Sequence, residues 1–115
     1  MSVIKLDLYN LQNWDNLPEK EIVSGMFAKI VHTDKTSVIR WRILKDAKLP
    51  EHSHPHEQIT LVLNGELLLT VDGKEFLLKK GDLLPIKSNL PHSGVAKLEC
   101  DVIDLFTPVR DDLQY

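Results

Sequence analysis

The chain has 115 residues, enough for one domain around a single hydrophobic core. Its hydrophobic fraction of 43% can supply that core, and no segment approaches the about 18 uninterrupted apolar residues of a membrane span. The formal charge is −3, with 14 basic and 17 acidic residues interspersed, so the composition argues against nucleic acid as a partner. The N-terminal residues lack the basic and apolar regions of a secretory signal, which makes the cytoplasm the expected location.

The N-terminal residues 1–20 are expected to form an extended arm or a short helical turn. Ile4, Leu6 and Leu8 alternate there with polar residues. A barrel of this size could not cover all the apolar groups of the arm by itself. We therefore expect the arm to add as a strand to a second copy, which together with the barrel edge would form a homodimer.

From residue 37 onwards the hydrophobic period is mostly two, which is typical of β-strands. The Asp72-Gly73 dipeptide between two apolar runs is a strong hairpin signal. Many short strands without long amphipathic helices predict an all-β barrel or jelly roll. The expected strands are 37–44, 59–63, 66–71, 74–78, 83–86 and 101–107.

Side chains that bind metals gather in two short segments, 52–58 and 91–92, which hold four of the five histidines. Residues two apart on a strand point to one side, so His52 and His54 are expected to share a face, with Gln58 close by. Three imidazoles and one amide oxygen would leave coordination positions of an ion open, as in catalytic sites. We therefore predict that His52, His54, Gln58 and His92 bind one divalent ion, Ni, Zn, Mn or Fe. His56 is expected outside this ligand set, because Pro55 bends the chain.

These segments resemble the two motifs of the cupin superfamily. The first is His52-x-His54-x3-Gln58-x6-Gly65, where many cupins have Glu in place of Gln58. The second runs from Gly81-Asp82 to Pro91-His92 and departs from the usual form at Lys87 and Asn89. The resemblance spans residues 38–110. It implies a single all-β cupin jelly-roll domain over 1–115, with the ion in the barrel mouth and commonly a homodimeric assembly.

The C-terminal segment resembles the small pectin-degradation cupins that ketonise 4,5-unsaturated monouronates to linear keto forms. The matching residues are Asp104, Phe106 and Arg110, which in that family lie at the active site. Asp104 and Phe106 share one face of the expected strand, and a carboxylate on an inward face is costly unless it is paired or functional. The resemblance implies that Asp104 is the general acid/base, that Arg110 binds the carboxylate of an anionic sugar acid, and that Phe106 forms an apolar wall. The alternative is a structural pairing of Asp104 with Arg110.

Other interpretations stay open. The same ligands suit a metal-dependent dioxygenase acting on a small organic substrate. A non-enzymatic cupin that binds a sugar or metabolite would lack an acid near the metal. Arg40 and Arg42 share a strand face and would join the site if that face points inward. Cys100 is the only cysteine, so it excludes an internal disulfide and is expected to be a packing residue without chemistry.

Overall fold

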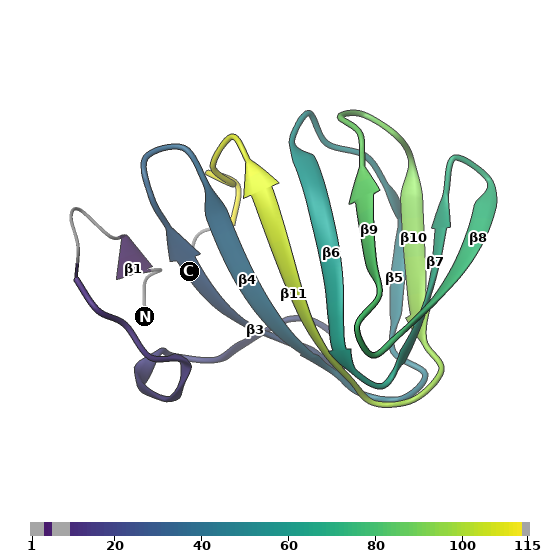
Figure 1. The fold of residues 1–115 in the computed structure, drawn as a ribbon, viewed down its shortest axis with the longest axis horizontal. Coiled ribbons are helices and arrows are strands. Elements are labelled where there is room, and N and C mark those ends of the chain that lie inside the picture. Colours follow the sequence, from purple (N-terminus) through teal and green to yellow (C-terminus); the bar gives the residue numbers. More distant parts are fainter. Residues whose placement is uncertain (1–3, 6–9, 114–115) are drawn as a thin grey trace.

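The structure, a computed structural model, describes residues 4–5 and 10–113 (Figure 1). Within this described part the helical structure is one short 3-10 turn, η1, and no helix could span a membrane. The elements are β1 Ile4–Lys5, η1 Trp14–Asn16, β2 Lys20–Val23, β3 Met26–His32, β4 Ser37–Ile43, β5 Lys48–His52, β6 Glu57–Asn64, β7 Glu66–Val71, β8 Lys74–Lys79, β9 Leu83–Ile86, β10 His92–Ala96 and β11 Cys100–Thr107.

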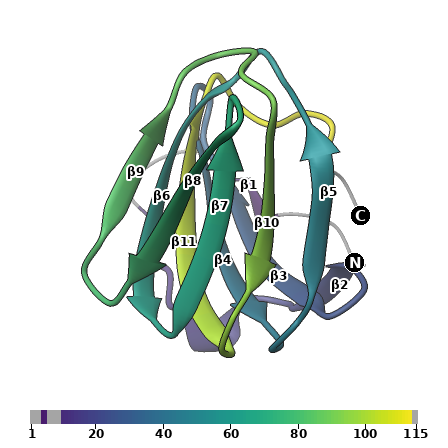
Figure 2. The same ribbon diagram turned by 90° about the vertical axis from the view of Figure 1, so that its right-hand side faces the viewer.

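The strands form two sheets that face each other as the walls of a barrel (Figures 1 and 2). The larger sheet has the order β1-β3-β4-β11-β6-β9, with β2 beside β3, and the smaller has the order β5-β10-β7-β8. From β4 to β11 the chain crosses from one sheet to the other at every connection except the β7–β8 hairpin. This alternation is that of a jelly roll, so the all-β fold predicted from the sequence is confirmed.

The core lies between the two sheets and follows the period of two. In β4 the side chains of Ile39, Trp41 and Ile43 are buried, whereas Arg40 and Arg42 lie on the outer face. The smaller sheet contributes the alternate apolar residues of β7 to the same core. Since successive strand residues point to opposite faces, one strand supplies both core and surface.

The barrel begins earlier in the chain than the sequence predicted. β2 and β3 precede residue 38, and β3 pairs along its whole length with β4. We expected the N-terminal arm to join a second copy, but Ile4–Lys5 pairs in parallel with β3 of the same chain. The arm residues Leu6 and Leu8 lie outside the described part of the structure.

Candidate metal centre and active site

The predicted metal ligands meet at one end of the barrel because strand ends place them there. His52 ends β5 and His92 begins β10, and the register of the two strands pairs these residues directly. Gln58 is the second residue of β6 and is paired in register with Phe106 of β11. His54 differs from the prediction, because it lies in the connection after β5 and not on a strand face shared with His52.

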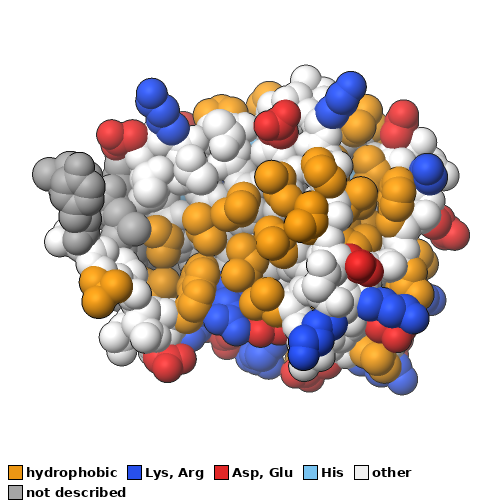
Figure 3. Space-filling model, in the orientation of Figure 1, with side chains coloured by type: hydrophobic (Ala, Val, Ile, Leu, Met, Phe, Trp, Pro, Cys, Tyr) orange, Lys and Arg blue, Asp and Glu red, His pale blue; other side chains and the backbone are white. Residues whose placement is uncertain are grey.

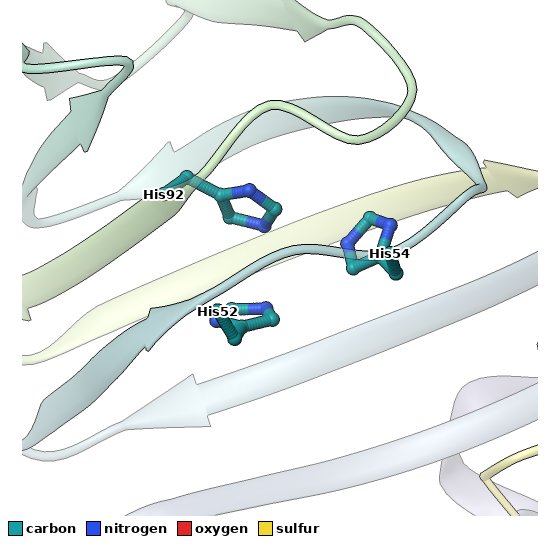
Figure 4. Close-up of side chains that lie close together, drawn as sticks. All are labelled: His52, His54 and His92. Atoms are coloured by element: carbon teal, nitrogen blue, oxygen red, sulfur yellow. The ribbon is translucent and has the colours of Figure 1, made fainter.

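The three imidazoles point toward one another (Figure 4). A ligand nitrogen from each of His52, His54 and His92 lies within 4.8 Å of the other two. The ring centroid of His92 is 4.3 Å from that of His52 and 4.9 Å from that of His54. His54 and His92 are buried, and His52 is half-buried at the barrel mouth. The spacing is therefore suited to one ion held by all three rings.

Backbone carbonyls fix the tautomer of each imidazole. In all three rings Nδ1 lies at hydrogen-bonding distance from a main-chain oxygen, which can only accept a hydrogen. Each Nδ1 therefore carries the proton, and each Nε2 has a free lone pair, the form in which histidine binds a metal. The acceptors for His52, His54 and His92 are the carbonyls of Pro50, His56 and Leu90, at 3.0, 3.1 and 2.9 Å.

Gln58 presents its oxygen to the same place. Its Nε2 donates to Thr60 Oγ1 at 2.9 Å and to Asp104 Oδ1 at 3.2 Å, so its Oε1 is the atom that faces His54 Nε2 at 3.1 Å. With His54 protonated at Nδ1, both facing atoms are acceptors. A cation bound by both atoms would remove their mutual repulsion. Gln58 Oε1 is therefore suited to be the fourth ligand of a divalent ion, beside the three imidazoles.

Burial favours the neutral form of His54 and His92. It is the largest cause that lowers the pKa of His54 to about 4, with the charge of Arg110 as the next cause. Burial likewise lowers the pKa of His92. A histidine must lose its proton to bind a metal, so the lowered pKa values favour the form of these two rings that coordinates an ion.

Asp104 lies beneath the ligand cluster, on the inward face of β11 as its parity predicted. Its Oδ2 accepts from Trp41 Nε1 at 2.9 Å, and its Oδ1 accepts from Thr60 Oγ1 at 2.6 Å and from Gln58. Burial raises the pKa of Asp104, against the opposite effect of these hydrogen bonds. A cavity of about 50 Å³ adjoins Asp104, Gln58, Thr60 and His92 and is otherwise mainly apolar.

Phe106 and Arg110 lie at the mouth. The guanidinium carbon of Arg110 is 4.6 Å from the centroid of the Phe106 ring, which contacts His54 edge-on at 5.6 Å. The guanidinium forms an ion pair with Asp112. The ion pairs found among the described residues do not join Arg110 to Asp104, which argues against the structural pairing considered for these two residues.

Several polar residues of the site could not be identified from the motifs. Thr60 shares the inward face of β6 with Gln58, and strand parity could have found it. Trp41 comes from β4, and only its tertiary position shows that it donates to Asp104. Asp112 follows Arg110 by two residues, a spacing too common to single it out.

The side chains of the other candidates lie outside the ligand cluster. Arg40 and Arg42 face outward and pair with Asp101 and Glu19 respectively, so they do not join the cavity. His56 is outside the three-imidazole cluster, although its carbonyl accepts from His54. Cys100 is buried and burial raises the pKa of its thiol, consistent with a packing role.

Comparison with known proteins places the chain in a family. The family model of the cupin domain matches residues 39–105. The chain belongs to the cupin family. This cupin is 32% identical over 101 residues to the pectin degradation protein KdgF of Dickeya dadantii (strain 3937), covering 85% of the chain and 92% of that relative. The resemblance to pectin-degradation cupins inferred from the sequence is thereby confirmed.

Two solved structures are similar over nearly their whole length. KdgF from a Halomonas species superposes with a TM-score of 0.86 and 28% identity, covering 92% of this cupin and 99% of that chain. An RmlC-like cupin from Shewanella frigidimarina NCIMB 400 also has a TM-score of 0.86, with 24% identity and coverage of 91% and 96%. The second likeness supports the fold alone.

Proposed function

We propose that this cupin is a metal-dependent isomerase that converts 4,5-unsaturated monouronates to linear keto forms. The observation that carries the proposal is the placement of a buried acid, Asp104, under three converging imidazoles, with the Arg110 guanidinium beside them. The similarity to two KdgF proteins, one of them named as a pectin degradation protein, supports the same substrate class.

His52, His54, Gln58 and His92 would hold the divalent ion. Imidazole and amide ligands suit Ni, Zn, Mn or Fe, and the metal would act as a Lewis acid that polarises a ring or enol oxygen. The carbonyl partners of the Nδ1 atoms hold the rings in the ligand tautomer. Gln58 is held in turn by Thr60 and Asp104, which directs its oxygen toward His54.

The size of the interior cavity favours a substrate that binds at the mouth. A cavity of about 50 Å³ has room for a water or two but not for a sugar ring. We propose that Arg110 binds the substrate carboxylate and that Phe106 lies against the sugar ring. The part of the substrate that reacts would then lie over the imidazoles, and water in the small cavity, which adjoins both His92 and Asp104, would connect it with the Asp104 carboxyl group.

Asp104 is the proposed proton carrier. The reaction is an isomerisation, in which one proton is added at a carbon of the double bond and one leaves a hydroxyl. Burial raises the pKa of Asp104, so this carboxyl group holds a proton more readily than a solvated one, which suits a general acid/base. Among the described residues Oδ2 accepts one hydrogen bond, from Trp41, whereas Oδ1 accepts two, so we propose that Oδ2 carries the proton.

We also propose a homodimer, formed through the outer face of the larger sheet. Apolar side chains cover much of this face in Figure 3. Ile59 and Leu63 of β6 and Leu83 of β9 are exposed there, at 36%, 37% and 57%. On β6 the inward positions hold Gln58, Thr60 and Val62, whereas the outward positions after Glu57 hold Ile59, Leu61 and Leu63, so the outer face of this strand is mainly apolar. A second copy of the same face would cover these residues.

The function is tested by combining elemental analysis of the purified protein with assays on 4,5-unsaturated galacturonate and guluronate. Ketonisation removes the conjugated double bond, so the expected result is a loss of ultraviolet absorbance that stops after chelation. A protein that contains metal but leaves both substrates unchanged would contradict the proposal. Consumption of O₂ with a phenolic substrate would favour a dioxygenase, and binding of a sugar without turnover would favour a binding protein.

A further inference from the structure

The guanidinium of Arg110 is fixed at the barrel mouth. Its backbone N–H donates to Ser37 Oγ at 2.7 Å, and its side chain, only 10% exposed, lies over the Phe106 ring. The charge of Arg110 contributes to the lowered pKa of both His54 and His92. An anion bound to Arg110 would therefore be held next to the imidazole cluster.

Asp112 already occupies one edge of this guanidinium. Its two carboxylate oxygens accept from Nε at 2.9 Å and from Nη2 at 2.8 Å, which is the paired geometry that arginine offers to a bound carboxylate ligand. Arg110 is the largest cause that holds the pKa of Asp112 at about 2, so this carboxylate is ionised at neutral pH. The Asp112 side chain is 55% exposed and lies in a turn near the C-terminus, so it has room to move into solvent.

We infer that Asp112 is an internal competitor of the substrate, a carboxylate that holds the substrate-binding edge of Arg110 and leaves it when an anionic sugar binds. The inference rests on the proposed role of Arg110. A buried guanidinium without a partner is costly, so Asp112 stabilises the protein without substrate. Since one carboxylate replaces another, an acidic sugar can displace Asp112, whereas a neutral sugar cannot. Asp112 thereby weakens the affinity of the site for acidic sugars, and a neutral sugar, which has no carboxylate for Arg110, gains nothing from its removal.

The test measures binding and requires no turnover. D-galacturonate is a saturated monouronate without the double bond of the proposed substrate, and D-galactose is its neutral counterpart. Both are titrated calorimetrically into the protein as purified and into the variants Asp112→Asn and Asp112→Ala. Asp111→Asn is the matched control, because it removes the same charge from the neighbouring position, and the Asp111 carboxylate forms none of the ion pairs found in the described residues.

Removal of the competitor should tighten galacturonate binding by about fivefold in both Asp112 variants, with less than a twofold change in Asp111→Asn. Galactose binding should stay undetected in all of them. Galacturonate should shift the ¹⁵N signal of the Arg110 Nε–H group, and Arg110→Gln should remove the gain that Asp112→Asn confers.

Unchanged or weaker galacturonate binding in the Asp112 variants would overturn the inference, as would an Arg110 signal that does not respond to galacturonate. Absence of galacturonate binding in every variant would overturn it as well. The Asp112 variants could bind galacturonate more tightly while unsaturated uronates are not turned over. That result would support the inference about Asp112 and contradict the proposed isomerase reaction.

Discussion

His54 Nε2 and Gln58 Oε1 face each other at 3.1 Å with a lone pair on each atom. The contact cannot be a hydrogen bond of the neutral ring, because His54 Nδ1 donates to a carbonyl and a neutral imidazole has only one N–H. Protonation of the ring would allow such a bond, but burial lowers the pKa of His54 to about 4. The pair is therefore arranged for a cation, and metal binding should relieve its repulsion.

The first prediction is that a divalent ion stabilises the protein through this cluster. A ligand at 100 times its Kd that binds only the folded state adds about 2.7 kcal/mol to the free energy of unfolding. We expect a gain of this order for the chelated protein when Ni, Zn, Mn or Fe is restored. Urea unfolding with and without metal measures it. His92→Ala should lose the gain, and His56→Ala should keep it, because His56 lies outside the cluster.

The second prediction concerns the stability of the metal-free protein at acid pH. The pKa of His54 falls from 6.5 to about 4 on folding, so between these values the unfolded chain binds a proton that the folded chain does not. The free energy of unfolding should therefore decrease as pH falls from 6.5 to 4, by up to about 3 kcal/mol from this group. His54→Gln should lack this contribution, so the difference in stability between the two proteins should change across that range. A difference that stays constant with pH would contradict the prediction.

Local patterns predicted those parts of the site that depend on strand parity and motif spacing. Asp104 and Phe106 share a face because they are two residues apart, and the structure places both on the inward side of β11. The partners of Asp104 could not be predicted in this way. Trp41 and Thr60 are distant from Asp104 in sequence and reach it only because β4 and β6 both flank β11.

The alternation of apolar and polar residues does not reveal a strand whose two faces are both covered. In β3 the consecutive residues Ile30, Val31 and His32 are all buried, so the strand shows no alternation at its end and was not predicted. Val31 lies on the outer face beside residues of the N-terminal segment, including Leu17. The outer face of β3 is covered by a segment that is distant in sequence, and a local sequence pattern cannot reveal such a tertiary contact.

The third prediction concerns Gly65, the glycine of the first cupin motif. Gly65 joins β6 to β7 at φ +90, and an added Cβ would lie 2.1 Å from the Glu99 carbonyl oxygen and 2.8 Å from Cys100 Cα. Gly65→Ala should therefore prevent stable folding or cost more than about 3 kcal/mol, because backbone atoms cannot move aside easily. Gly73→Ala is the matched control, since it shares a left-handed backbone (φ +79) but has no atom within 4 Å. Its expected cost in thermal or urea unfolding is only about 1–2 kcal/mol.

The fourth prediction tests the proposed dimer. Leu83→Glu places a charge in the apolar outer face of the larger sheet and should convert the dimer to a monomer, because burial of an unpaired carboxylate is unfavourable. Leu77→Glu is the control, since Leu77 is similarly exposed, at 46%, but lies on β8 in the other sheet. Light scattering at micromolar concentration gives the mass of each variant. A monomeric wild-type protein, or dissociation by both substitutions, would contradict an interface at this face.

The fifth prediction separates the chemistry of Asp104 from its structural contacts. The amide of Asp104→Asn cannot donate and accept a proton as a carboxyl group does, so turnover should fall by about 10²-fold or more. The same change also places an amide NH₂ against donors, because both carboxylate oxygens accept hydrogen bonds. We therefore expect Asp104→Asn to lower the free energy of unfolding by about 1–3 kcal/mol. An activity assay alone would not distinguish this loss of stability from a loss of catalysis.

Trp41→Phe removes the one donor to Oδ2 and serves as the matched variant. In the double variant the amide NH₂ can turn toward the position of the missing indole N–H, so part of the stability lost in Asp104→Asn should return. Turnover should not return, because the carboxyl group is still absent, while Trp41→Phe alone should keep most of its activity. Urea unfolding, metal content and kcat are measured for all four proteins. A double variant that regains both stability and turnover would show that Asp104 acts through structure and carries no proton.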